Sequence, residues 1–114
     1  MPNLLVVDDD AQILDRFRYA FPPDQLTLQI ATNAREAFSL FLEVPFDVVI
    51  ADICLLDSSG MQLLQRLRAI DSRIPVILMT GYGTANIAIE AMHTGAFEHL
   101  LKPFEESVLI VLFA

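Results

Sequence analysis

Short apolar segments alternate along this chain with longer segments whose apolar residues recur at helical spacing. Compact apolar runs of four to six residues are typical of buried strands, and apolar residues three or four positions apart are typical of amphipathic helices. The predicted strands cover residues 4–7, 26–31, 46–51, 75–79 and 97–101.

The predicted helices carry recognisable start and stop signals. Asn33 with Glu36 three positions later is typical of a helix N-terminus, and Thr84 is a comparable capping residue. Gly95 is a residue able to take the left-handed turn that ends many helices. The predicted helices cover residues 11–21, 33–43, 60–70 and 84–95, and the stretch after Pro103 is also compatible with a helix.

Five strand-helix units in this order predict an α/β fold. We expect a flavodoxin-like (βα)5 doubly wound parallel sheet with helices on both faces and strand order 2-1-3-4-5. A length of 114 residues fits a single domain over residues 1–114. Because the chain stops in the apolar run 107–114 without a helix-ending residue, we expect it to be the N-terminal part of a longer protein.

Composition excludes several classes of protein. Hydrophobic residues make up 54% of the chain and charged residues 19%, which is too apolar for a disordered segment. A formal charge of −8 with seven Lys and Arg residues argues against direct nucleic-acid binding by this domain. Cys54 is the one cysteine, and no signal peptide or membrane-length apolar run is present, so we expect a cytoplasmic protein without a membrane partner.

Charged and hydroxyl residues end the predicted strands. The first strand runs into Asp8 and Asp9, the third into Asp52, the fourth into Thr80 and the fifth into Lys102. Ligands of doubly wound folds bind outside the carboxyl ends of the strands. We therefore expect three carboxylates, a hydroxyl and an ammonium to converge on one rim of the sheet.

Three carboxylates at one rim repel one another. Two unit charges about 4 Å apart interact by roughly 4 kcal/mol at an effective dielectric near 20. A single lysine does not offset the whole cluster, whereas Mg²⁺ suits hard oxygen ligands and bridges carboxylates to phosphate oxygens. A carboxylate can also accept a phosphoryl group covalently. The pattern therefore indicates phosphoryl transfer onto an aspartate.

Four motifs make the resemblance to a known family specific. They are "VVDDD" (6–10), "VVIADI" (48–53) followed by Gly60, "VILMTG" (76–81) and "LLKPF" (100–104). In this order and spacing the chain resembles the receiver domain of two-component response regulators over almost its whole length. It is most similar to receivers of nitrogen-regulation-type (NtrC-like) transcription activators.

The resemblance implies a role for each residue of the acidic site. Asp52 would be the phosphoacceptor and a Mg²⁺ ligand, and Asp9 would bind Mg²⁺ directly. Asp8 would act mainly through metal-bound water, and the backbone carbonyl of Cys54 would be a further ligand. Asp10 is more readily interpreted as the cap of the following helix.

The resemblance also implies roles around the phosphoryl group. Thr80 would hydrogen-bond one phosphoryl oxygen and Lys102 would neutralise another. Taken alone, such a threonine is usually an ordinary hydrogen-bonding residue at a strand end, and such a lysine is usually a solvated surface charge. Thr80 and His99 would form the switch, with His99 where the family often has Tyr or Phe. Cys54 and Tyr82 occupy positions that set the dephosphorylation rate, and we expect slow self-dephosphorylation.

The function implied is signalling rather than enzymatic turnover. A histidine kinase or phosphotransfer protein would supply the phosphoryl group. Phosphorylation would then change the surface formed by the fourth helix, the fifth strand and the fifth helix. We expect this surface to form a homodimer and to control an output domain. The resemblance to NtrC-like activators implies that this output is in transcription.

The chain departs from the family pattern after the phosphoacceptor. Leu56 stands where the family usually has proline, followed by Asp57, so we expect a less rigid loop with an added negative charge near the site. These departures and His99 keep open a receiver-like interaction module that is never phosphorylated. A small Mg²⁺-dependent phosphohydrolase and a flavin or nucleotide binder are further alternatives. A chain of 114 residues leaves little room for the substrate-covering cap of such a phosphohydrolase, and it lacks the glycine and hydroxyl residues after the first strand that would hold the phosphate of a flavin or nucleotide.

Overall fold

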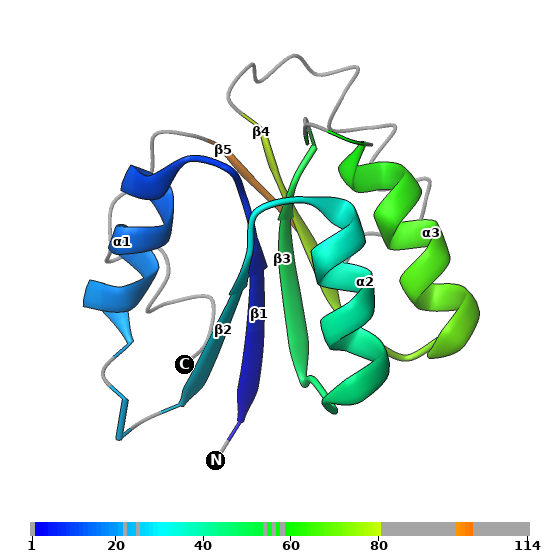
Figure 1. Cartoon of the computed structure of the whole chain (residues 1–114), viewed down its shortest axis with the longest axis horizontal. Coiled ribbons are helices and arrows are strands. Elements are labelled where there is room, and N and C mark those ends of the chain that lie inside the picture. Colours follow the sequence, from blue (N-terminus) through cyan, green and yellow to red (C-terminus); the bar gives the residue numbers. More distant parts are fainter. Residues whose placement is uncertain are drawn as a thin grey trace.

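A parallel sheet of five strands forms the centre of the molecule in the computed structural model (Figure 1). The strand order is β2-β1-β3-β4-β5, as predicted. The strands are β1 (Asn3–Val7), β2 (Thr27–Ala31), β3 (Val48–Asp52), β4 (Val76–Thr80) and β5 (Glu98–Leu101). The structure describes residues 2–21, 23–24, 26–53, 55, 57, 59–80 and 98–101, with Thr80 and 98–101 described by their backbone.

Helices cover both faces of the sheet. In Figure 1, α1 (Ala11–Ala20) lies on one face, and α2 (Ala34–Glu43) and α3 (Gly60–Ile70) lie side by side on the other. This arrangement confirms the doubly wound parallel fold. The helices predicted over 84–95 and after Pro103 fall outside the described residues.

Side-chain alternation along the inner strands divides the core into two layers. In β1, Leu5 and Val7 face α2 and α3, whereas Leu4 and Val6 face α1. β3 and β4 alternate in the same way. Because both faces are buried, these strands are continuously apolar, which made them recognisable in the sequence.

The first helix is one residue shorter than predicted. Phe21 was expected inside it, but α1 ends at Ala20 and Phe21 takes an extended conformation with φ −127° and ψ 94°. Phe21 precedes Pro22, and the residue before a proline is sterically disfavoured in the helical region. The Phe21 ring is still buried, in the layer beneath α1.

The third strand begins two residues later than predicted. Phe46 and Asp47 precede it, and the Phe46 ring stacks on Phe41 at a centroid distance of 6.3 Å. A carboxylate oxygen of Asp47 accepts a 2.7 Å hydrogen bond from the backbone N–H of Asn3. These contacts place 46–47 at the amino end of the sheet and leave Asp52 as the last residue of β3.

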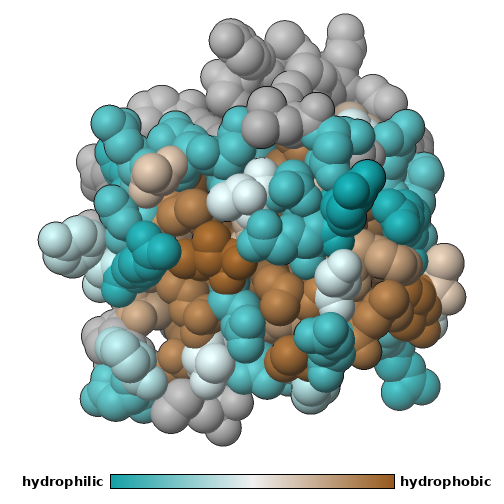
Figure 2. All heavy atoms as spheres, in the orientation of Figure 1, coloured by the Kyte–Doolittle hydropathy of each residue, from teal (hydrophilic) through white to brown (hydrophobic). Residues whose placement is uncertain are grey.

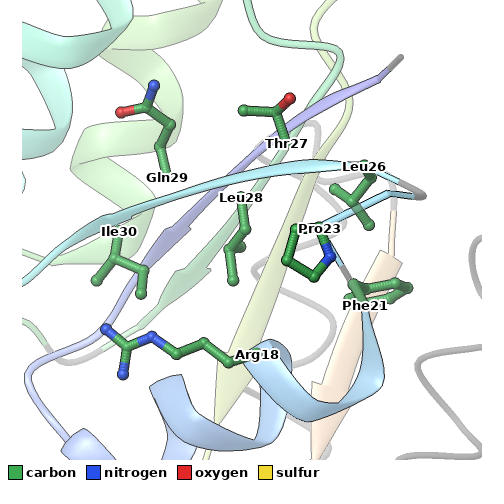
Figure 3. A pocket seen from close by; sticks show the side chains of 8 residues that line it. All are labelled: Arg18, Phe21, Pro23, Leu26, Thr27, Leu28, Gln29 and Ile30. Atoms are coloured by element: carbon green, nitrogen blue, oxygen red, sulfur yellow. The ribbon is translucent and has the colours of Figure 1, made fainter.

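An apolar groove of about 620 Å³ lies between α1 and the edge strand β2. Figure 2 shows apolar side chains on this face of the molecule, bordered by hydrophilic ones. In Figure 3, Leu28 and Ile30 point into the groove toward Arg18, whereas Thr27 and Gln29 point to the opposite side of β2. The edge strand therefore keeps the two-residue alternation of a sheet.

Candidate functional site

Strand register brings the acidic residues to one rim of the sheet. Val7, the last residue of β1, pairs with Ala51 of the neighbouring parallel strand β3, so the next residues along the two segments are Asp8 and Asp52. The backbone N–H of Asp8 donates a 3.0 Å hydrogen bond to the carbonyl of Ala31, which ends β2. The predicted convergence of the first and third strand ends is thus present.

Asp8, Asp9 and Asp52 form a three-carboxylate cluster. Each offers an oxygen that lies within 4.8 Å of the oxygens offered by the other two. Asp8 is fully buried, Asp52 is 8% exposed and Asp9 is exposed. Burial removes water that would otherwise weaken the repulsion between carboxylates, so a cation bound here gains more than at an open surface.

The donor set of this cluster fits Mg²⁺. All three offered atoms are carboxylate oxygens, the hard ligands that Mg²⁺ and Ca²⁺ select, and no histidine or cysteine joins the cluster among the described residues. The exposed Asp9 leaves one side accessible to water, which Mg²⁺ retains in most protein sites. The acidic cluster is therefore consistent with a receiver Mg²⁺ site.

The third aspartate of the run Asp8–Asp10 has a different role. An Asp10 carboxylate oxygen accepts a 2.9 Å hydrogen bond from the N–H of Gln12 and caps the N-terminus of α1. The Asp10 N–H in turn donates to a carboxylate oxygen of Asp8 at 3.0 Å. This confirms the capping role, and it also helps to orient the Asp8 carboxylate.

Gly60 allows α3 to approach the end of β3 closely. A Cβ atom at this position would lie 2.3 Å from the backbone oxygen of Asp52. The Gly60 N–H donates a 2.7 Å hydrogen bond to the carbonyl of Ile53. The glycine that formed part of the sequence motif is thus required by its contact with the backbone of the predicted phosphoacceptor.

Asp57 makes a contact that the sequence did not reveal. Its two carboxylate oxygens accept hydrogen bonds from the N–H groups of Ala34 and Arg35, at 2.9 and 3.0 Å, in the first turn of α2. These backbone hydrogen bonds hold the pKa of Asp57 below its ordinary value. From the sequence, Asp57 was expected to add a negative charge near the site; in the structure its carboxylate faces the positive end of a helix dipole.

The remaining predicted site residues are described in part or not at all. Thr80 ends β4 and pairs with Leu101, one position beyond the pair of Asp52 and Met79, so its backbone lies at the same rim. His99 lies in β5 and pairs with Leu78 of β4. The predicted site residues Cys54, Tyr82 and Lys102 fall outside the described residues.

The sequence profile of the response regulator receiver domain matches residues 4–114. The chain belongs to this family. Receiver domains are typically non-enzymatic phosphoacceptors in signalling, and the family implies a histidine kinase partner. The match covers all of the described strands and helices except Asn3, the first residue of β1.

Curated relatives of this receiver domain are transcriptional regulators. It is 36% identical over 103 residues to the regulatory protein AtoC of Escherichia coli (strain K12), covering 90% of this chain and 22% of AtoC. It is 35% identical over 101 residues to the response regulator PilR of Pseudomonas aeruginosa, covering 89% of this chain and 23% of PilR. Both are NtrC-family activators. The chain thus spans less than a quarter of the length of either relative.

Solved receiver structures share the whole fold. A response regulator receiver domain from Clostridium thermocellum superposes with a TM-score of 0.88 at 34% identity, covering 97% of this chain and 90% of that one. The BeF3-activated DrrB receiver domain superposes with a TM-score of 0.88 at 25% identity, covering 99% and 94%. None of the helices in the described part of this chain is long and apolar enough to cross a bilayer.

Proposed function

We propose that this receiver accepts a phosphoryl group on Asp52 from a histidine kinase or phosphotransfer protein. The observation that carries the proposal is the cluster of Asp8, Asp9 and Asp52, whose carboxylate oxygens meet at the carboxyl rim of the sheet. Family membership supplies the reaction class, and the position of Asp52 at the end of β3 supplies the acceptor.

The phosphoryl transfer forms one bond and breaks one bond. A carboxylate oxygen of Asp52 attacks phosphorus, the phosphorus–nitrogen bond of a phosphohistidine breaks, and the imidazole leaves with the bonding electron pair. When bound, Mg²⁺ neutralises negative charge on the carboxylates and on the phosphoryl oxygens. Asp8 and Asp9 contribute the fixed oxygens that hold the cation beside Asp52.

Further residues complete this proposal around the rim. The Cys54 carbonyl adds a metal ligand, Thr80 donates to one phosphoryl oxygen, and Lys102 neutralises another. Cys54 and Tyr82 carry neither the carboxylate nor the amide that best orients an attacking water. Slow self-dephosphorylation follows.

The proposal also covers how phosphorylation would control an output domain. Movement of Thr80 toward the phosphoryl group and reorientation of His99 would change the surface of the fourth helix, β5 and the fifth helix. That surface would form a homodimer and control an output domain in transcription. The regulators AtoC and PilR extend well beyond the region that this chain matches, which supports the proposal of an output domain.

Binding of a phosphoryl mimic tests the proposal directly. Beryllofluoride with Mg²⁺ should shift the amide resonances of Asp52 and its neighbours in the wild-type protein, and Asp52→Asn should abolish the shifts. Asp24→Asn, an equal charge change at an exposed position in the turn before β2, serves as the matched control and should respond like wild type.

A labelled small phosphodonor provides the chemical readout. Wild type should acquire an acid-stable, base-labile label that requires Mg²⁺, and it should not turn over external phosphate esters. If the wild-type protein acquires no label and also does not bind beryllofluoride, the result would support the phosphorylation-independent interaction module. Ester turnover would instead support a phosphohydrolase.

Assembly has its own test. Sedimentation of wild type at increasing concentration should show a dimer that is strengthened by Mg²⁺ and beryllofluoride. A monomer under all these conditions would contradict the proposed dimer without affecting the chemistry at Asp52.

A further inference from the structure

Asp57 joins the segment after Asp52 to the start of α2. Its two carboxylate oxygens accept separate hydrogen bonds from consecutive backbone N–H groups, those of Ala34 and Arg35. Asn33 caps the next N–H, that of Glu36, at 2.8 Å. Two side chains therefore accept hydrogen bonds from the backbone N–H groups in the first turn of α2. Asn33 directly precedes the helix, whereas Asp57 comes from a distant part of the sequence.

The start of α2 is also connected to the acidic cluster through the backbone. β2 ends at Ala31, three residues before α2 begins, and the carbonyl of Ala31 accepts the hydrogen bond from the N–H of Asp8. The β2–α2 corner, defined here as residues 31–35, thus contacts the segment that carries Asp8 on one side and Asp57 on the other.

The segment between β3 and α3 is anchored at its two ends as well. The Gly60 N–H bonds to the carbonyl of Ile53, and Gly60 packs against the backbone oxygen of Asp52. Leu55 packs against the core layer beneath α2 and α3. Asp57 lies between these anchors and ties the middle of the segment to the β2–α2 corner.

We propose that Asp57 is a positioning residue that holds the segment after Asp52 against the β2–α2 corner and thereby raises the affinity of the acidic cluster for Mg²⁺ and a phosphoryl group. The inference rests on the proposed function. The family usually has a proline one residue before this position, which stiffens the segment, whereas this chain has Leu56 there. In this chain the two hydrogen bonds to Asp57 would provide that stiffness instead. The lowered pKa of Asp57 agrees with a carboxylate that remains charged and bonded.

The physical basis is the entropy of ordering. Fixing the backbone of a residue costs conformational entropy, and a segment that is already fixed by Asp57 does not add this cost to ligand binding. If Asp57 is removed, the segment must be ordered when Mg²⁺ and the phosphoryl mimic bind. Ordering about one residue corresponds to roughly tenfold weaker binding.

A matched pair of variants separates positioning from helix capping. Asp57→Ala and Asn33→Ala each remove side-chain acceptors from the first turn of α2, but only Asp57→Ala releases the segment after Asp52. Calorimetric titration with Mg²⁺, and with beryllofluoride in the presence of Mg²⁺, measures affinity, and urea unfolding measures stability. We expect Asp57→Ala to bind both about tenfold more weakly, while Asn33→Ala binds like wild type despite a comparable loss of stability.

Asp57→Asn provides a graded variant that keeps the size of the side chain. Its amide offers one oxygen where the carboxylate offers two, so it should keep one of the two hydrogen bonds and bind with intermediate affinity. Wild-type affinity in Asp57→Ala, or equal weakening in Asn33→Ala, would overturn the inference while leaving the proposed function intact. Failure of the wild-type protein itself to bind Mg²⁺ and beryllofluoride would overturn the proposed function, and this inference with it.

Discussion

Three consecutive aspartates have three different environments. Asp8 is fully buried beside Asp52, Asp9 is exposed but belongs to the same cluster, and Asp10 caps α1. These differences arise because the chain leaves β1 and turns into a helix within three residues, so successive side chains point in different directions. Identical chemical groups thereby acquire separate tasks.

Removing one exposed charge from the cluster should stabilise the protein without metal. In Asp9→Asn the repulsion from Asp8 and Asp52 is relieved, and for an exposed charge this amounts to about 0.5–1 kcal/mol of unfolding free energy. In excess Mg²⁺ the wild-type protein should become the more stable of the two, because it gains more unfolding free energy from binding the cation. Urea unfolding with Mg²⁺ and with a chelator measures both effects. The same difference between the two proteins under both conditions would show that Asp9 does not bind the cation.

The stabilisation by Asp57 should depend on pH. Its pKa in the folded protein lies below the ordinary value of 3.8, chiefly because of the hydrogen bonds from Ala34 and Arg35. A depressed pKa stabilises the fold above pH 3.8, and this stabilisation is lost as the pH falls through the lower folded value. The difference in unfolding free energy between wild type and Asp57→Asn should therefore be full at pH 6 and shrink below about pH 3.8.

Asn33→Ala is the control for this titration, since its amide does not ionise. Its loss of stability should stay constant over the same pH range, provided that each measurement is compared with wild type at the same pH. A parallel pH dependence in the two variants would assign the effect to other carboxylates.

At the scale of elements, the contact between α3 and the end of β3 fixes the site. α3 begins at Gly60, directly against the backbone of Asp52, and Ser59 caps the helix by accepting a 3.1 Å hydrogen bond from the N–H of Gln62. On the same face, the guanidinium of Arg66 lies 4.1 Å from the centre of the Phe38 ring and links α3 to α2. The position of Asp52 therefore depends on how closely a helix approaches a strand.

Gly60→Ala should be destabilising, although alanine is the better helix former. The helical preference favours alanine by about 1 kcal/mol, but the added Cβ would lie 2.3 Å from a backbone oxygen, and overpacking of this kind costs typically 1–3 kcal/mol. We expect a net loss of up to about 2 kcal/mol in urea unfolding, together with weaker beryllofluoride binding. Gln65→Ala, at an exposed position of α3, should change stability by less than about 0.5 kcal/mol. A more stable Gly60→Ala protein would contradict the close approach.

At the scale of the whole molecule, the sheet separates two apolar layers. One lies beneath α2 and α3 and the other beneath α1, and both use alternate residues of the same strands. Among the described residues, Phe17 is the largest fully buried side chain, and it belongs to the α1 layer, on the opposite side of the sheet from α2. Stability is therefore shared between two layers, and the acidic rim lies at the strand ends that both layers hold in place.

Phe17→Ala should cost about 3–5 kcal/mol of unfolding free energy, because it leaves a cavity in a close-packed layer. Tyr19→Ala, two residues further along α1, is the matched control. Tyr19 is 79% exposed, so its removal should change stability by less than about 0.5 kcal/mol. Urea unfolding of both variants measures the difference. Equal effects would mean that α1 does not pack as described.

Local signals in the sequence were enough to predict the buried parallel strands and the caps at Asp10 and Asn33, because apolar runs mark buried strands. The strand order, and with it the grouping of Asp8, Asp9 and Asp52, was predicted from the flavodoxin-like arrangement, in which the first and third strands are neighbours and end at one rim.

Tertiary structure alone decided the partner of Asp57 and the contact that makes Gly60 necessary. Asp57 accepts hydrogen bonds from residues 22 and 23 positions earlier in the chain, and no periodicity or motif encodes a pairing between a loop and the start of a distant helix. A carboxylate in a loop can face water, a cation or a helix end, and its sequence neighbours are the same in each case. Only the packing of α2 and α3 on one face of the sheet brings the start of α2 within hydrogen-bond distance of that loop.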